Sequence, residues 1–252
     1  MSISDEKTAP PKENSENRTP LLRVEELSKS FSSFQALCDV SFGLSERDIL
    51  GIIGPNEAGK TTLLECLTGL LPASSGLVLW KTHSLPVHER KDLMFYLPQD
   101  IAPYSEQPAF RLTGLYRDVY NLSREREHEV LGRLKLQKVL SRRVGELSRG
   151  YRRRLLLALA LLTPKPLLLL DEPFDGLDPR QTLEVADLLR EESAAGRTLI
   201  LSVHQLADAA RICSRYLLLV EGRVVGCGTM EELRTQAGVE STNLEAIFFA
   251  LT

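Results

Sequence analysis

Short apolar runs, each followed by a polar and often glycine-containing stretch, recur along the chain. The most compact runs contain few polar side chains, as is typical of strands buried on both faces, and lie at 49–53, 167–170 and 198–203. Weaker strand candidates lie at 21–24, 40–44, 77–80 and 93–97. Because helical patterns alternate with these runs, the sequence predicts parallel β-α-β units and an α/β core.

Cap and turn signals bound the other predicted elements. Helices are expected over 60–67, 148–162 and 178–195, and Gly196 ends the last of them. Thr229 and Glu232 form a capping box that begins another short helix. Two predicted hairpins or turns are marked by dipeptides, Ser32-Ser33 and Glu221-Gly222.

Changes in composition and hydrophobic pattern divide the chain into four parts. Residues 1–20 are polar and contain proline, so we expect a disordered tail. Between about 100 and 146, a charged amphipathic helix begins after Ser123 and indicates a helical subdomain. We therefore expect one folded unit over 21–237, with this subdomain inserted in it, and a C-terminal extension over 238–252.

Composition excludes some classes of protein. The chain has 252 residues, 43% of them apolar and 26% charged, as in globular proteins. Its net charge of −3 gives no bulk attraction to nucleic acid, and no nucleic-acid partner is expected. The most apolar stretch, 155–170, is interrupted by Pro164 and Pro166, so we expect no span of a bilayer.

Cysteines and arginines suggest no further chemistry. None of the four cysteines forms a C-x-x-C pair, which favours buried thiols in a reducing compartment over a metal site. Near mid-chain, arginines gather in a cluster that we interpret as a solvated helix face: Arg142, Arg143, Arg149, Arg152, Arg153 and Arg154.

A glycine-rich loop carries the strongest chemical signal. The stretch Gly54-Pro55-Asn56-Glu57-Ala58-Gly59-Lys60-Thr61 matches the Walker A pattern between a predicted strand and a predicted helix. Its backbone N–H groups, continuing through Thr62, are suited to cradling phosphates. Lys60 supplies a positive charge for the β- and γ-phosphates, and Thr61 offers a hydroxyl to Mg²⁺. The loop predicts binding of a nucleoside triphosphate.

A second signal follows the run of leucines at 167–170. Asp171 and Glu172 come at the carboxyl end of this predicted strand, where ligands bind in parallel sheets. This is a Walker B pattern. Asp171 is expected to hold Mg²⁺, through water, and Glu172 to polarise the attacking water as general base.

Further motifs follow in an order that resembles the ABC ATPase family over about residues 21–236. Leu147-Ser148-Arg149-Gly150-Tyr151 is similar to the family signature, about twenty residues before Walker B. Gln99 matches the Q-loop glutamine, Asp178 the D-loop and His204 the switch histidine. Phe31 matches the aromatic residue that stacks on adenine, with Phe34 as the competing candidate.

The resemblance implies roles for these residues. Gln99 would contact the Mg²⁺ site and link it to the helical subdomain, and His204 would contact the γ-phosphate. Ser148 and Gly150 would face ATP bound to a second chain, so that two cassettes enclose two ATP molecules. The expected partner cassette is an identical copy, with a paralogue left open.

The resemblance also implies a fold and a function. The fold would be a P-loop NTPase core with a mostly parallel sheet, an N-terminal antiparallel β subdomain and an inserted α-helical subdomain. The chain would be an ATPase, peripheral on the cytoplasmic face of the cell membrane, that powers export through a separate multi-span permease. The alternative is a soluble ABC ATPase without transport, acting in assembly, as a scaffold, or on DNA or ribosomes.

Two features leave alternatives open. The segment 243–252 resembles the tail of exporter ATPases that serve type-two ABC permeases. The alternative is a plain amphipathic helix that covers the core. Three residues also depart from the family pattern, Glu57 and Arg149 at usual glycines and Tyr151 at a usual glutamine. We expect Glu57 to point to solvent, and Arg149 to lie near the partner's γ-phosphate or to pair with the facing chain.

Overall fold

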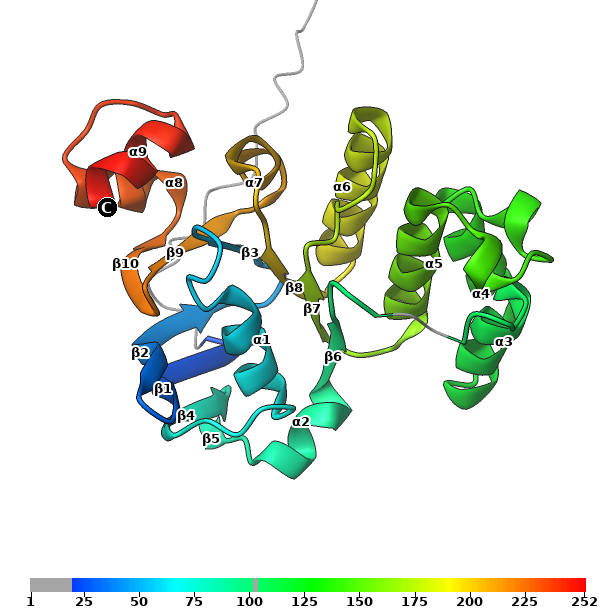
Figure 1. The fold of residues 1–252 in the computed structure, drawn as a ribbon, viewed down its shortest axis with the longest axis horizontal. Coiled ribbons are helices and arrows are strands. Elements are labelled where there is room, and N and C mark those ends of the chain that lie inside the picture. The colour runs from blue at the N-terminus through cyan, green and yellow to red at the C-terminus, as the bar shows by residue number, and fades with distance from the viewer. Residues whose placement is uncertain (1–19, 102–103) are drawn as a thin grey trace, which may run out of the picture.

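Two β-sheets organise the chain in a computed structural model that describes residues 20–101 and 104–252 (Figure 1). The predicted tail over 1–20 lies outside these residues except for Pro20. The larger sheet has the strand order β10-β9-β3-β8-β7-β6. Its strands are β3 (Ile49–Ile53), β6 (Met94–Leu97), β7 (Leu167–Asp171), β8 (Thr198–Ser202), β9 (Arg215–Val220) and β10 (Arg223–Gly228).

Four of the five strand pairings in this sheet agree with the predicted β-α-β pattern. Strands β6, β7, β8, β3 and β9 run parallel, and only β10 is antiparallel, to β9, across the Glu221-Gly222 turn. Parallel strands bring their carboxyl ends to one edge of the sheet. The Walker A loop after β3, Asp171 at the end of β7 and His204 just after β8 therefore meet at the same edge.

Alternation along β3 explains why the sheet is buried on both faces. Leu50 and Ile52 face one hydrophobic core, together with α1 (Lys60–Thr68) and the smaller sheet. Ile49 and Ile53 face a second core that contains the leucines of α5 (Arg149–Leu162). Because successive strand residues point to opposite faces, an uninterrupted apolar run fills both cores.

The smaller sheet is antiparallel, with the order β2-β1-β4-β5. Its strands are β1 (Leu22–Phe31), β2 (Phe34–Leu44), β4 (Ser75–Trp80) and β5 (His83–Ser84). The first two extend well beyond the predicted 21–24 and 40–44, as a long hairpin closed at Ser32-Ser33. Their extra residues mix polar with apolar side chains and exposed with buried positions, so hydrophobicity alone did not reveal them.

The helices lie on both faces of the larger sheet. In Figure 1, α3 and α4 lie at the opposite side of the molecule from the smaller sheet, and α8 and α9 lie near β10. The remaining helices are α2 (Val87–Leu93), α3 (Ala109–Val119), α4 (Arg124–Arg133), α6 (Pro179–Ala194), α7 (Leu206–Ile212), α8 (Met230–Ala237) and α9 (Leu244–Leu251). The division of the chain into a unit at 21–237 and an extension at 238–252 stays a prediction.

The predicted helix starts agree with the observed caps. At four of the predicted helix starts, a side chain accepts a backbone hydrogen bond in the first turn: Ser123, Ser148, Asp178 and Thr229. At the carboxyl terminus, Leu244 and Ile247 of α9 are buried, whereas Phe249 is exposed. Across residues 20–101 and 104–252, no helix has the length and apolarity needed to cross a bilayer.

Candidate functional site

The Walker A loop connects β3 to α1 and closes around the ammonium group of Lys60. The Lys60 Nζ donates hydrogen bonds of 2.8 Å to the carbonyls of both Gly54 and Pro55. The side chain is almost fully buried, and this desolvation lowers the pKa of Lys60 while Glu172 and Asp171 oppose the shift. The loop thus holds a positive charge at the amino end of α1.

Two positions of the loop require unusual backbone conformations. Gly59 has a φ of 100°, and a β-carbon there would lie 2.6 Å from the carbonyl oxygen of Ala36. Glu57 also has a positive φ, 66°, although it carries a side chain. Its side chain is exposed, as the sequence predicts. The left-handed conformation explains why a glycine fits this position most easily.

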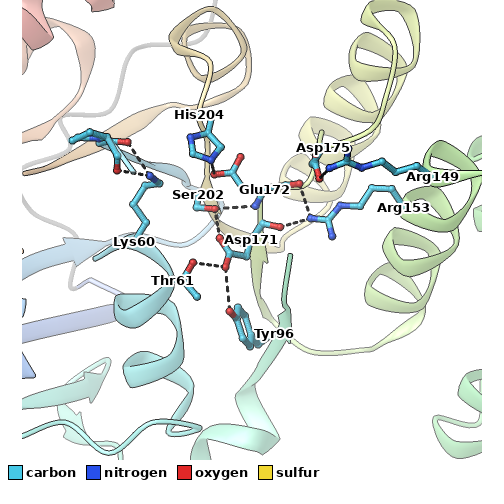
Figure 2. Close-up of polar contacts among 12 residues, drawn as sticks. Lys60, Thr61, Tyr96, Arg149, Arg153, Asp171, Glu172, Asp175, Ser202 and His204 are labelled. Carbon is cyan, nitrogen blue, oxygen red and sulfur yellow. Dashed lines mark hydrogen bonds and ion pairs between the residues drawn. The ribbon is translucent and has the colours of Figure 1, made fainter. Parts of the chain in front are cut away.

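Asp171 lies buried at the end of β7 and accepts hydrogen bonds from three hydroxyl groups (Figure 2). Thr61 Oγ1 donates to its Oδ2 at 2.8 Å, and the Tyr96 hydroxyl donates to the same oxygen at 3.3 Å. Ser202 donates to Oδ1. Burial and the carboxylate raise the pKa of Tyr96, so this hydroxyl keeps its proton and remains a donor.

Glu172, the next residue, points toward His204 across the carboxyl ends of β7 and β8 (Figure 2). Glu172 Oε1 and His204 Nε2 are 3.1 Å apart. Burial raises the pKa of Glu172 to about 7, against the attraction of Lys60. Burial also lowers the pKa of His204. A carboxyl group with a pKa near neutrality, next to a histidine, is suited to accepting a proton from water.

One cleft of about 560 Å³ brings most of the predicted residues together. Its floor contains the Walker A loop and Glu172, and its mouth carries the exposed rings of Phe31 and Phe34. The predicted residues that line it are Phe31, Asn56, Glu57, Gly59, Lys60, Thr61, Thr62, Gln99, Glu172 and His204. Pro55 and Ala58 line an adjoining hollow beyond Phe34. The cleft therefore combines aromatic, cationic and carboxylate side chains.

Three predicted residues lie away from this cleft. Ser148 begins α5 and its hydroxyl accepts a hydrogen bond from the Tyr151 amide at 3.4 Å. Gly150 packs against the carbonyl of Gly176, and Asp178 caps α6. None of the three is among the cleft-lining residues. Within the described part of this single chain, they do not reach the phosphate-binding loop.

The arginine cluster differs from the predicted solvated face. Arg153 is 4% exposed and donates to backbone carbonyls of two sequence-distant segments, at 98–99 and 171–173. Arg154 is also buried, where it lies over the Tyr151 ring and donates to the Leu134 carbonyl. The interpretation was wrong for these two residues, because backbone carbonyls supply acceptors that sequence spacing does not reveal.

Arg149 pairs within its own chain. Its Nη2 lies 2.5 Å from Asp175 Oδ2, three residues after Glu172 (Figure 2). The aliphatic part of Arg149 lies over Gly176, whose φ is 75° and where a β-carbon would lie 2.6 Å from Arg149 Cγ. The Arg149 side chain is nevertheless 73% exposed.

Sequence reasoning missed three residues that brace the site, Tyr96, Arg153 and Ser202. Ser202 is buried and links both acidic residues, because its Oγ also accepts the Glu172 amide at 2.8 Å. Asp171 and Ser202 are register partners on adjacent parallel strands. A polar residue at the end of an apolar strand can therefore be used to predict a contact with an acidic residue at the end of the neighbouring strand. For Arg153, the sequence offers no such signal.

Comparisons with known proteins agree with these features. A family model described as ABC transporter matches residues 37–175. The chain is 34% identical over 220 residues to the uncharacterized ABC transporter ATP-binding protein YxlF of Bacillus subtilis, covering 86% of this chain and 73% of that protein. It is 32% identical over 221 residues to the lipopolysaccharide export system ATP-binding protein LptB of Acidithiobacillus ferridurans, covering 84% and 92%.

Structural comparison gives the same result. A solved structure of the ATP-binding subunit of an ABC transporter superposes with a TM-score of 0.83 at 29% identity, covering 92% of this chain and 99% of that chain. The predicted fold class is confirmed. Since the family model spans more than half of the chain and the relatives exceed 30% identity, the chain belongs to the ABC transporter family, as one of its ATP-binding, ATP-hydrolysing subunits.

Proposed function

We propose that this subunit binds ATP and Mg²⁺ in the 560 Å³ cleft and hydrolyses ATP with Glu172 as general base, to power export through a separate membrane permease. One observation carries the catalytic part of the proposal. The Glu172–His204 contact lies in the same cleft as Lys60 and Thr61. A proton acceptor, a phosphate-binding cation and a hydroxyl metal ligand are thereby placed around one volume.

The residues present suit a magnesium ion held jointly with nucleotide phosphates. Thr61 and Asp171 are already in contact at 2.8 Å, and Gln99 lines the same cleft. Among the described residues, no group of three histidine, cysteine or acidic side chains forms a metal cage of its own. Mg²⁺ typically takes one or two protein oxygens and completes its shell with water and phosphate. Such an ion would neutralise phosphate charge when bound.

The chain's own residues account for the remaining chemistry. Lys60 neutralises charge on the β- and γ-phosphates, and the amides of Gly59 to Thr62 bind phosphate oxygens at the start of α1. Glu172 accepts a proton from the water that attacks the γ-phosphate. Its pKa of about 7 matches that task near neutral pH. His204 hydrogen-bonds the γ-phosphate and positions it. Phe31 stacks on the adenine at the cleft mouth.

The positions of Ser148, Gly150 and Asp178 support a site shared between two chains. ABC ATP-binding subunits pair with membrane permease components and dimerise. Ser148 and Gly150 begin α5, whose exposed amino end carries free N–H groups and a partial positive charge. We infer that this end meets the γ-phosphate held by a second cassette, and that Asp178 lies at the same contact.

Export is favoured by relatives and by the carboxyl-terminal segment. LptB, at 32% identity, is the ATP-binding protein of an export system. The segment 243–252 resembles the tail of exporter ATPases that serve type-two permeases, although Leu244 and Ile247 of α9 also cover the core. The subunit would then lie at the cytoplasmic face of the membrane, held there by the permease. A soluble ABC ATPase without transport remains the alternative.

Paired substitutions test the catalytic assignment. With the permease present, Glu172→Gln is expected to bind ATP but to lose hydrolysis by about 100-fold or more, because the amide cannot accept the proton. Lys60→Ala is expected to lose most of its ATP binding, because the phosphates lose their buried cation. The measurements are nucleotide binding and steady-state phosphate release. A Glu172→Gln chain with undiminished turnover would remove Glu172 from the role of base.

Co-purification tests the transport assignment. The tagged chain is expected to retain a multi-span membrane protein after detergent extraction, and ATPase activity is expected to rise in that complex. Recovery of soluble partners alone, with activity independent of any membrane protein, would favour the soluble alternative.

A further inference from the structure

Two departures from the family pattern have opposite charges and lie on the two surfaces that the proposed shared site brings together. Glu57 replaces a glycine in the phosphate-binding loop, and Arg149 replaces a glycine in the signature segment. Each alone places a charge beside the triphosphate. Together they offer a carboxylate on one surface and a guanidinium on the other.

The Glu57 carboxylate is available for a partner. It lies on the rim of the ATP cleft, three residues before Lys60, and is exposed. Within residues 20–101 and 104–252, no hydrogen bond or ion pair involves this side chain. Its left-handed backbone, with a φ of 66°, places a charged residue where glycine fits most easily. Neither a contact within the chain nor backbone preference accounts for glutamate here.

Arg149 is partly engaged and can accept a second acidic partner. One of its terminal nitrogens contacts Asp175, yet 73% of the side chain is exposed. A guanidinium has five N–H donors, so one contact leaves others available. Asp175 and Gly176 also fix the path of the side chain along the amino end of α5. The group is therefore held beside Ser148, the residue proposed to meet the opposite ATP.

We propose that Glu57 of one chain pairs with Arg149 of a second copy of the same chain, so that two such ion pairs flank the two shared ATP sites. The proposal rests on the shared site of the proposed function. A second copy satisfies both charges at once, twice per dimer. A paralogue with glycine at both positions would leave Glu57 without a partner and Arg149 with Asp175 alone, so the chain is assigned as a homodimer.

Charge reversal gives a direct test, because the two reversed chains complement each other. In the Glu172→Gln background with MgATP, the dimer dissociation constant is measured by sedimentation velocity. Glu57→Arg and Arg149→Glu are each expected to weaken the dimer by about tenfold, since like charges then meet at both sites. An equimolar mixture of the two reversed chains re-forms both attractive pairs, and its dimerisation is expected to return to within about threefold of the unreversed chain.

Controls separate the pair from effects within one chain. Asp175→Asn removes the negative charge that Arg149 contacts within its own chain, and it is expected to change dimerisation by less than about threefold. Glu57→Gln and Arg149→Gln, which keep side-chain size, are expected to weaken the dimer less than the reversals do, and no more when combined than singly. Unchanged thermal unfolding midpoints verify that each variant is folded.

Each outcome decides a different question. A mixture that dimerises no better than either reversed chain alone would overturn the ion pair while leaving the shared site intact. Unreversed Glu172→Gln chains that stay monomeric with MgATP would overturn the shared site, and the pair with it. Restored dimerisation in the mixture, lost again on raising the salt concentration, is the result that the proposal requires.

Discussion

At the scale of single residues, the central feature of the site is the Asp171 carboxylate, which accepts hydrogen bonds from three hydroxyl groups. Asp171 is predictable from the sequence, because an acidic residue at the end of an apolar strand beside a phosphate loop has few other roles. Two of its donors, Tyr96 and Ser202, come from strands that flank β7 in the sheet. Their proximity depends on strand order, which the sequence pattern does not specify.

Removing the Ser202 hydroxyl is predicted to affect hydrolysis and stability together. Ser202→Ala leaves the buried Glu172 amide without its acceptor and one Asp171 oxygen without its donor. We expect about 1–3 kcal/mol of destabilisation by denaturant unfolding and about a 10- to 100-fold loss of ATPase rate. Ser214→Ala is the matched control, because that hydroxyl bonds Ile49 at the opposite end of the sheet. Equal activity loss in both variants would contradict a local role.

Phe31 and Phe34 are register partners across the β1–β2 turn, and both line the cleft, so the choice between them needs a measurement. We predict that Phe31→Ala weakens ATP binding by about tenfold, since base stacking on an aromatic ring contributes about 1–3 kcal/mol. Phe34→Ala is expected to change binding by less than about threefold. Equilibrium binding of a fluorescent ATP analogue distinguishes the two, and the reverse order would assign adenine to Phe34.

At the scale of elements, helix α5 shows where sequence reasoning succeeds and fails. The cap at Ser148 and the run of leucines were sufficient to predict the helix. They were not sufficient to place Arg153, which lies in the core against carbonyls from before α3 and after β7. A buried charge is tolerated when nearly all its donors are satisfied, and those acceptors come from segments far apart in sequence.

Substitution of Arg153 is predicted to be costly even by another cation. Arg153→Lys keeps the charge but provides only three donors on a point charge, in place of a planar group that contacts five carbonyls. We expect about 2–4 kcal/mol of destabilisation in urea unfolding. Arg152→Lys is the control, since Arg152 makes one side-chain contact of 3.4 Å, and it should stay within about 0.5 kcal/mol. Similar losses in both would refute the bracing role.

At the scale of the whole molecule, the parallel sheet was the most predictable part. Its strands at 49–53 and 167–170 are apolar on both faces, and that pattern has few alternatives to a buried parallel sheet. The short elements β5, α2 and α7 were missed, because two to seven residues give too little periodicity to recognise. The Walker A loop and Ser148 lie apart in one chain, and only a family resemblance anticipated that separation.

Two neighbouring glutamates connect α4 to the rest of the molecule and differ in burial. Glu192 is nearly buried and pairs with Arg126 of α4 at 2.7 Å and with Arg197 at 3.2 Å. Glu191 is exposed and pairs with Arg133 at 2.5 Å. We predict that Glu192→Gln costs about 1–3 kcal/mol, because it leaves two partly buried guanidinium groups poorly paired. Glu191→Gln should cost less than about 1 kcal/mol.

Hydrogen exchange measures this difference locally. Amides of α4 are expected to exchange faster in Glu192→Gln than in Glu191→Gln, because the buried pair fastens α4 to α6. Equal exchange rates in the two variants would mean that apolar packing alone holds the helix in place.

The contacts of Arg153 have a mechanical consequence. One guanidinium donates hydrogen bonds to the carbonyls of Gln99, Asp171 and Glu172, and its side chain belongs to the helix that begins after Ser148. Hydrogen bonds of this kind weaken steeply when donor and acceptor separate by a fraction of an ångström. A shift of α5 therefore either displaces the backbone of Glu172 as well or weakens these hydrogen bonds. The start of α5 and the strand end that carries Asp171 and Glu172 are therefore mechanically coupled through one side chain.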